Sequence, residues 1–493
     1  MTRERRVGRF LVWIAGFALA AVSLLGWAYA SAPGSSPDDD FHLASIWCGV
    51  GERAGLCEQA PIQDQRLIPA DVLGATCHVR DEDSSAACII VEDARAMVPT
   101  DRGNFDGLYP PVFYAVTGIF ASDDVWGSIA GIRLFNGLVF LVFLGALLLF
   151  SPRWARAPAT LIPIVTLVPL GLYLVASVNP SSWAITSALV VTCALLLIPG
   201  SDGARRIGLV AVAVLGTALG AGARADAGLY AVLAVVVALV LGLRRARSAW
   251  WLVATGVAIV VIAALSYLGA GQSSAATEGL MGRPPASLSD ALFLFATNFF
   301  EIPQLWAGVF GYWDLGWFDL PLKSFVWVIG WAVFAIALWV GLRRIGPRKA
   351  VALGIAFAAV WGYPLLLHVQ SQTYVGSFVQ PRYVLPGMII LIVVALLDEP
   401  TTLRLADHGA AQRWIVVLGL GIANALALFS VIRRYVTGND AGGLDLDAGI
   451  EWWWTESPAF SPMVVWALGS AAFAALLVLV LGRRPRAVAS LEA

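Results

Sequence analysis

Long runs of apolar residues, separated by short polar segments, make up most of the chain. A helix that crosses the hydrocarbon core of a bilayer needs roughly 20 mostly apolar residues. Runs of about this length predict about twelve spanning helices, at residues 10–30, 127–150, 158–177, 183–199, 207–223, 227–243, 249–270, 321–342, 350–368, 383–397, 412–432 and 462–482. The least regular division is "GARADAG" (222–228), which is either a turn between two helices or a break within one.

Composition supports a membrane protein. Hydrophobic residues make up 59% of the 493 residues and charged residues 13%, whereas soluble domains are about 25% charged. The formal net charge is −1, so nothing indicates a nucleic-acid partner. We therefore expect an all-α, polytopic integral membrane protein in which residues 1–493 form a single domain within the lipid bilayer.

Basic residues are concentrated in every second short loop, and they also flank the first and last spans. Examples are Arg153 and Arg156, Arg205 and Arg206, and Lys349. The positive-inside rule places these loops in the cytoplasm. We therefore expect a multi-pass protein of the cytoplasmic membrane with both termini in the cytoplasm.

The long segments all fall on the other side of the predicted membrane, at 31–126, 271–320 and 434–461. Chemistry that needs several polar groups is therefore expected on the outer face. The first apolar run ends in a small-x-small pattern, Ala28-Tyr-Ala30, that fits signal-peptide cleavage. Its length exceeds the usual 7–15 apolar residues of a signal peptide, which favours a retained helix.

Four of the five cysteines, Cys48, Cys57, Cys77 and Cys88, lie in the first outer loop. Cysteines in an exported loop predict two disulfides, with three possible pairings, of which pairing between sequence neighbours is the simplest. A zinc site is the rival interpretation, although the spacings lack the tight C-x-x-C pattern. Cys193 lies inside a predicted span and is expected to be a small buried apolar residue.

Three carboxylates and a histidine follow the first predicted span, in "PDDDFH" (37–42). A helix N-cap would explain one or two of these acids. On a helix, His42 would share a face with Asp38 and Asp39, because three or four residues separate them. A carboxylate beside an imidazole can act as a general base or anchor a metal ion. We therefore expect a catalytic site here, with Mg²⁺ or Mn²⁺ as a possible cofactor.

Arginines near the outer ends of predicted spans run against the positive-inside trend: Arg224, Arg382 and Arg433. Arginine can bind a lipid phosphate through two parallel hydrogen bonds. Ordinary headgroup contact is the alternative, and Arg224 can instead pair only with Asp226. Arg133 lies inside the second span, where its side chain either serves a function or extends to the interface.

Aromatic residues gather on the predicted outer face as well. "YPPVFY" (109–114) is typical of an interfacial or re-entrant segment. Trp313 and Asp314 place a flat ring beside an acid, as carbohydrate sites do, although anchoring at the membrane interface also explains such tryptophans.

These features resemble the GT-C superfamily of membrane glycosyltransferases. "PDDDFH" is similar to a P-D-E-x-x-H motif that opens a large family of uncharacterised bacterial multi-spanning proteins related to that superfamily. Further matches are "YPPVFYAV" (109–116), "NPSS" (179–182), "GVFGYWD" (308–314), "QPRYVLP" (380–386) and "FSVIRRYV" (429–436). The chain departs from the pattern where Asp39 replaces Glu and Pro381 replaces Gly. These departures leave open whether Asp38 or Asp39 is the base.

The resemblance implies transfer of a sugar from a polyprenyl-phosphate donor to an envelope glycan, lipid or protein acceptor, at the outer face of the cytoplasmic membrane. Asp38 or Asp39 would be the base, and His42 its partner or an acceptor contact. The donor phosphate is assigned to Arg382, with Arg224 or Arg433 as alternates. Contacts to the sugar or acceptor are assigned to Asp40, Tyr109, Trp313 and Asp314.

Two other hypotheses are a transporter or lipid-linked glycan flippase and a non-catalytic envelope scaffold. A transporter would place ionisable residues at mid-membrane, in broken helices of repeated halves. A scaffold would use the acids only to begin a helix.

Overall fold

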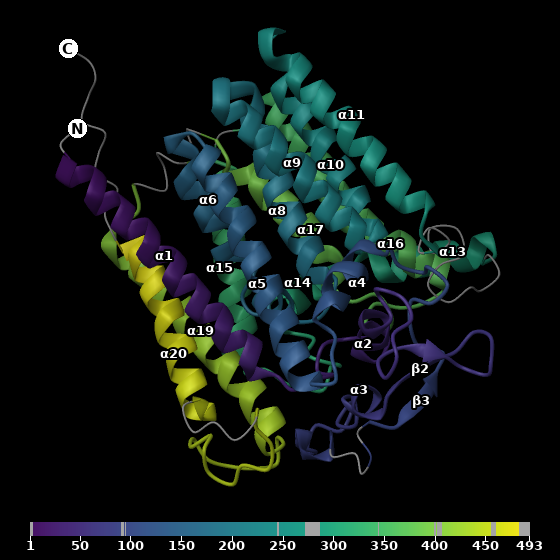
Figure 1. Cartoon of the computed structure of the whole chain (residues 1–493). Helices are drawn as coiled ribbons and strands as arrows, with labels where there is room; N and C mark the ends of the chain where they lie inside the picture. Colours follow the sequence, from purple (N-terminus) through teal and green to yellow (C-terminus); the bar gives the residue numbers. More distant parts are fainter. Residues whose placement is uncertain are drawn as a thin grey trace.

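The computed structural model is a bundle of long helices with a smaller, loop-rich region at one end (Figure 1). The structure describes residues 3–89, 93, 95–243, 246–271, 286–343, 345–398, 401, 407–454 and 460–482. Parts of two predicted outer loops, residues 272–285 and 455–459, lie outside the described residues.

Ten of the described helices are long and apolar enough to cross a membrane. They are α1 (Arg3–Ala30), α5 (Val125–Phe150), α8 (Ser181–Leu197), α9 (Gly203–Ala223), α10 (Ala225–Gly242), α11 (Ala246–Leu268), α15 (Ser324–Gly341), α16 (Pro347–Ser371), α19 (Ala410–Val436) and α20 (Pro462–Leu477). The segment 222–228 is confirmed as a junction between two helices, because α9 ends at Ala223 and α10 begins at Ala225.

The other two predicted spans are helical but short. The stretch 158–177 is not one helix, because α6 (Arg153–Thr166) and α7 (Leu170–Val175) divide it. Proline explains the division: Pro169 precedes α7, and proline cannot continue a helix ladder across its own nitrogen. The stretch 383–397 forms α17 (Pro381–Leu396), which is 16 residues long.

Shorter elements complete the bundle: α13 (Leu288–Phe299), α14 (Ile302–Val309), the 3₁₀ turn η3 (Ile198–Gly200) and the π-helical turn η6 (Val478–Gly482). The centre of the bundle holds α8 and α17, which are buried along almost their whole length. The first turn of α17, which contains Arg382, lies at the end of the bundle that carries the first outer loop.

The first outer loop has a small fold of its own. Its helical elements are α2 (Asp39–Trp47), α3 (Ala70–Gly74), η1 (Ala86–Ile89), α4 (Val112–Thr117) and η2 (Gly118–Phe120). Three short strands, β1 (Glu58–Gln59), β2 (Arg66–Pro69) and β3 (Met97–Thr100), form an antiparallel sheet in the order β1-β2-β3. Glu58 is opposite Leu67, and Arg66 is opposite Thr100.

The disulfides join sequence neighbours, Cys48 to Cys57 and Cys77 to Cys88. This pairing confirms the simplest prediction and excludes a zinc site on these four cysteines. Cys193 is buried in α8, as expected.

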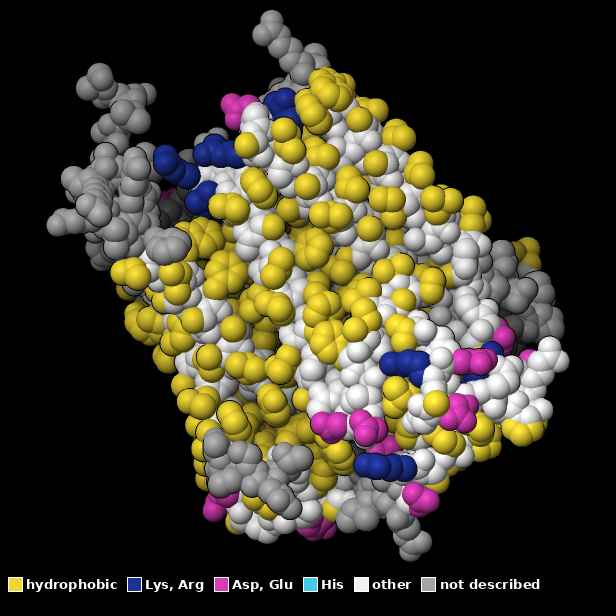
Figure 2. Space-filling model, in the orientation of Figure 1, with side chains coloured by type: hydrophobic (Ala, Val, Ile, Leu, Met, Phe, Trp, Pro, Cys, Tyr) yellow, Lys and Arg dark blue, Asp and Glu magenta, His cyan; other side chains and the backbone are white. Residues whose placement is uncertain are grey.

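The two ends of the bundle differ. In Figure 1, α1 and α6 both begin at one end, while α2, α3, β2 and β3 lie at the other. Figure 2 shows a broad band of hydrophobic side chains between these ends, with Lys and Arg side chains at the end where α6 begins and a mixture of acidic and basic side chains at the other. This distribution is typical of a bundle that spans a bilayer.

Candidate active site

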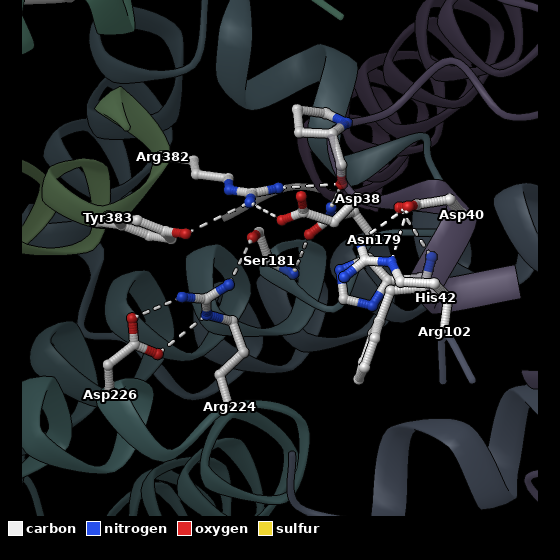
Figure 3. Close-up of polar contacts among 12 residues, drawn as sticks. Asp38, Asp40, His42, Arg102, Asn179, Ser181, Arg224, Asp226, Arg382 and Tyr383 are labelled. Carbon is white, nitrogen blue, oxygen red and sulfur yellow. Dashed lines mark hydrogen bonds and ion pairs between the residues drawn. The ribbon is translucent and has the colours of Figure 1, made fainter. Parts of the chain in front are cut away.

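The start of α2 is held by two other helices. The carbonyl oxygen of Pro37 accepts hydrogen bonds from Asn179, 2.8 Å, and from Nη1 of Arg382, 3.0 Å. Asn179 lies directly before α8, and Arg382 lies in the first turn of α17. The two most buried helices of the bundle therefore fix the position of the acidic segment (Figure 3).

Asp38 occupies the N-cap position of α2 without acting as a cap. Its backbone is left-handed, with φ 63° and ψ 23°, and its side chain makes no capping hydrogen bond. Left-handed backbone is uncommon for residues with a side chain, although Asp tolerates it better than most. The carboxylate instead pairs with Nη2 of Arg382, and 33% of its side chain is exposed. Asp38 therefore has the predicted N-cap position, but its side chain does not cap the helix.

Two arginines face one tyrosine ring. The guanidinium carbon of Arg382 lies 5.3 Å from the centre of the Tyr383 ring, and that of Arg224 lies 5.1 Å from it. Arg224 lies between α9 and α10 and pairs with both carboxylate oxygens of Asp226, at 2.9 and 2.8 Å. It therefore pairs with Asp226 and also reaches the cluster (Figure 3).

The charge of Asp38 depends on Arg382. Burial acts to raise the pKa of Asp38, but nearby charges, that of Arg382 first, and the hydrogen bond from Arg382 together outweigh it, and the pKa lies below the usual range. Asp38 is therefore an ionised carboxylate at neutral pH, exposed in part and adjacent to a cation.

Asp39 has different surroundings. It is fully buried, and one of its oxygens accepts a hydrogen bond from the backbone N–H of Ser36, 2.9 Å. Burial raises the pKa of Asp39 to about 7, although the charge of Arg133 acts against this rise. Arg133 itself donates to the carbonyls of Ala28, 3.0 Å, and Ala32, 2.7 Å, so it fixes the end of α1. Neither residue is exposed.

His42 lies within an aromatic cluster. Its Nδ1 lies 2.9 Å from the hydroxyl of Tyr114, while its Nε2 is buried and has no hydrogen-bond partner among the described residues. Burial lowers the pKa of His42 to about 3, so the ring is neutral at physiological pH. Tyr109 packs edge-on against His42, and burial raises the pKa of Tyr109 to about 12.

Asp40 lies at the rim of this cluster. It pairs with Arg102 at 2.8 Å, and 30% of the Asp40 side chain and 55% of the Arg102 side chain are exposed. The Arg102 guanidinium also covers the Phe41 ring, 5.8 Å from its centre. This pair connects α2 to the segment after β3.

Other predicted site residues have contacts of their own. Arg433 donates to the carbonyls of Gly443, 3.1 Å, and Asp445, 2.9 Å, so it holds the last described outer loop. Asp314 is half-buried with φ 58°, and burial raises its pKa. Trp313 packs against Gly308 of α14. A Cβ at position 308 would lie 3.2 Å from the Trp313 ring and would overlap Pro381, so the glycine allows this close packing.

Three contributors were not singled out from the sequence: Tyr383, Ser181 and Tyr114. The motif matches nevertheless contain them, since Tyr383 follows Arg382 in "QPRYVLP" and Ser181 lies in "NPSS". Oγ of Ser181 lies 3.4 Å from Nη1 of Arg224. For Tyr383, the sequence signal that could have found it is its position next to Arg382, which was already selected.

The described residues contain no group of three or more His, Cys, Asp or Glu side chains placed to hold a metal ion. Each of the three acids has its own partner instead: Arg382 for Asp38, the Ser36 N–H for Asp39 and Arg102 for Asp40. The arrangement can accept a proton at Asp38 and stabilise negative charge beside Tyr383.

No curated protein matches the chain. The crystal structure of ArnT from Cupriavidus metallidurans bound to undecaprenyl phosphate is similar, with a TM-score of 0.47 and 15% sequence identity, over 96% of this chain and 78% of that chain. The model of one protein family, described as predicted membrane protein (DUF2142), matches residues 21–394. Because this match covers well over half of the sequence, the chain belongs to the DUF2142 family of predicted membrane proteins.

Proposed function

We propose that this protein is a glycosyltransferase that moves a sugar from a polyprenyl-phosphate carrier to a hydroxyl group of an envelope acceptor. The observation that carries the proposal is the ion pair between Asp38 and Arg382. Arg382 and Arg224 both lie over the Tyr383 ring, so a second cation is near this pair. This combination offers a base to an acceptor hydroxyl and cations to a lipid phosphate, next to helices that cross the membrane. The resemblance of "PDDDFH" and the later motifs to a family related to the GT-C superfamily also supports it.

The reaction follows from these groups. The acceptor oxygen forms a bond to the anomeric carbon of the sugar while the bond from that carbon to the phosphate oxygen breaks. The proton of the acceptor hydroxyl passes to the Asp38 carboxylate, which acts as general base. The negative charge that develops on the leaving polyprenyl phosphate is stabilised by Arg382 and Arg224.

Donor binding would also strengthen the base. Arg382 holds the pKa of Asp38 low, against the effect of burial. When a donor phosphate shares the charge of Arg382, burial has the larger effect and the pKa of Asp38 rises. Asp38 would therefore be a stronger base in the complex that holds the donor, where the acceptor hydroxyl must be deprotonated.

Between the two acids that the sequence left open, we propose Asp38. Asp39 is fully buried, and one of its oxygens already accepts from the Ser36 N–H. An acceptor hydroxyl would reach Asp38 without movement of the chain, since a third of that side chain is exposed.

The test is glycan analysis of the envelope in cells that lack the gene and carry either the native protein or a variant. Asp38→Asn should reduce transfer by about 10²–10⁴-fold, the usual contribution of a general base, with an unchanged amount of folded protein in the membrane. Asp64→Asn, an exposed acid of the same outer loop, is the matched control and should transfer normally. Normal glycans with Asp38→Asn would refute the assignment.

The same cells distinguish a transferase from a flippase. A transferase defect leaves the lipid-linked sugar on the outer leaflet, where a membrane-impermeant oxidant such as periodate reaches it. A flippase defect leaves that sugar on the inner leaflet, protected in intact cells. We expect the accumulated donor in Asp38→Asn cells to be oxidised.

A further inference from the structure

An apolar cavity lies away from the candidate active site, lined by α1, α5, α6, α7, α20 and η6. Its volume is about 210 Å³, well above the small voids of a close-packed interior. Gly16 and Ala20 of α1 form one wall, Leu144 of α5 and Pro163 of α6 another.

Local sequence explains why helices do not fill this space. A Cβ on Gly16 would meet Leu479 at an ordinary 3.5 Å, so small residues on α1 leave room rather than allow close packing. Across the cavity, α6 ends at Thr166 and the chain turns into α7, instead of continuing as one straight span.

Hydrocarbon suits this cavity better than water. Its lining comes mainly from predicted spans and is apolar apart from Ser23 and Thr160. The Thr160 hydroxyl donates to the carbonyl of Arg156, 2.8 Å, in its own helix. A buried water needs two to four polar partners, and the Ser23 hydroxyl provides only one such group.

One end of the cavity is bordered by cations. Trp13 lines the cavity, and the guanidinium carbon of Arg156 lies 5.5 Å from the centre of its ring. Arg156 is one turn before Thr160, which also lines the cavity, and Arg153 is exposed at the start of α6. Nε and Nη2 of Arg156 donate to the carbonyls of Ser151 and Leu149, 3.2 Å each, which holds its charge beside Trp13. Arg153 lies one turn before Arg156 on the same helix.

The length of the cavity fits one leaflet. Its lining on α1 extends from Val12 to Leu24. Twelve residues at a rise of 1.5 Å span about 18 Å, a little more than half of the roughly 30 Å hydrocarbon core of a bilayer. One acyl chain of a phospholipid in a single leaflet has this reach.

We propose that this cavity binds an acyl chain of an anionic phospholipid, with the lipid phosphate against Arg153 and Arg156. Apolar burial holds the chain, and the two arginines select the headgroup charge. The site lies at the end of the bundle opposite the Asp38–Arg382 pair and is independent of the proposed sugar transfer.

The test measures lipid retained by the full-length protein. The protein is placed in nanodiscs of equal phosphatidylglycerol and phosphatidylcholine, re-extracted into mild detergent and analysed by native mass spectrometry. We expect one phosphatidylglycerol per chain. Ala20→Trp, which fills the cavity, should lower this retention at least tenfold, and the double change Arg153→Gln and Arg156→Gln should abolish the preference for the anionic lipid.

The matched control is Leu138→Trp, which adds the same ring to α5 at a position that is 57% exposed and outside the cavity lining. It should retain phosphatidylglycerol like the native protein. Equal retention in the Ala20→Trp protein, or native protein that retains both lipids equally, would overturn the proposal. If Ala20→Trp does not fold, the native protein and the double arginine variant still decide the question.

Discussion

At the scale of single residues, Asp38 and Asp39 are neighbours in sequence with opposite surroundings. The left-handed backbone at Asp38 turns its carboxylate to Arg382, while Asp39 is buried near Arg133. The sequence predicted an acidic site here and could not choose between the two acids. That choice depends on one backbone angle and on arginines 94 and 344 residues away along the chain, which spacing within "PDDDFH" does not contain.

The buried carboxyl of Asp39 should make stability depend on pH. Its pKa is about 7 in the folded protein and roughly 3.9 in an unfolded chain. The folded state therefore binds the proton more tightly, and the contribution of Asp39 to stability falls as pH rises from about 4 to about 7. A shift of this size corresponds to on the order of 4 kcal/mol.

Asp39→Asn removes this dependence. His42 has the opposite effect, since its lowered pKa makes stability increase with pH up to its unfolded value, so the variant must be compared with the native protein at each pH. We expect the unfolding temperature of Asp39→Asn minus that of the native protein to be larger at pH 8 than at pH 4. A difference that is the same at both pH values would contradict a protonated Asp39.

Arg382→Lys tests the planar guanidinium. Arg382 bonds the Pro37 carbonyl and Asp38 at once and covers the Tyr383 ring. A lysine ammonium is a point charge that cannot reproduce this geometry. We expect sugar transfer to fall by about 10²-fold, the loss typical of one stabilising donor. Arg205→Lys, a change at an exposed position, is the control, and an equal effect of both changes would argue against a specific role.

At the scale of elements, α2 and α4 approach one another through glycine. A Cβ on Gly49 would overlap the carbonyl oxygen of Tyr114, and one on Gly118 would lie 2.8 Å from the carbonyl of Ile46. This close approach sets the 2.9 Å contact between His42 and the Tyr114 hydroxyl. The glycines therefore position the imidazole without contacting it.

Gly49→Ala should disturb the candidate site through this contact. The obstacle is backbone, so α2 and α4 must separate, and the buried His42 then loses its partner, which costs about 1–3 kcal/mol. We expect lower thermal stability together with reduced sugar transfer. Gly442→Ala adds the same methyl group where nothing lies within 4 Å, and this control should behave like the native protein.

The second disulfide holds a segment that several polar contacts attach to the bundle. His78 lies 3.2 Å from the Pro33 carbonyl, and Arg434 donates to the His78 carbonyl, 2.8 Å, and pairs with Asp319 at 2.9 Å. Arg434, in the last turn of α19, is therefore a buried support for the outer loops.

Replacing Cys77 and Cys88 with Ser should destabilise this region. The bond closes a loop of 11 residues, for which chain entropy predicts about 3 kcal/mol. Hydrogen exchange of residues 66–89 should become faster, while that of α8 should not change. A reducing agent, which also opens Cys48–Cys57, should likewise speed exchange of residues 66–89 in the native protein. Unchanged exchange in the variant would show that the polar contacts alone hold the segment.

Apolar runs predicted helices well and small elements poorly. Each of the twelve predicted spans is helical. In lipid, the backbone N–H and C=O groups of a spanning segment have no water to bond, and a helix bonds them to one another. The division between α6 and α7 follows from prolines that hydropathy does not weigh. The strands of the first outer loop were not predicted, since they are two to four residues long and have no alternating pattern of sufficient length.

At the scale of the whole molecule, the two ends of the bundle carry different chemistry. The disulfides, the acids of α2 and the Asp38–Arg382 pair lie at one end, and Arg153 and Arg156 at the other (Figure 1). Disulfides persist in oxidising compartments, and short basic loops stay in the cytoplasm. Both rules predict that the candidate active site lies on the outer face, where the proposed polyprenyl-phosphate donor would meet an envelope acceptor.

Cysteine labelling tests this orientation. The native cysteines do not interfere, because four are in disulfides and Cys193 is buried. Asp64→Cys, between β1 and β2, should react with a membrane-impermeant maleimide in intact spheroplasts. Asp202→Cys, exposed between α8 and α9, should react only after the membrane is permeabilised, and Asp64→Ser should not react at all. The reverse pattern would place Asp38 and Arg382 in the cytoplasm and refute sugar transfer at the outer face, whatever the activity of the purified protein.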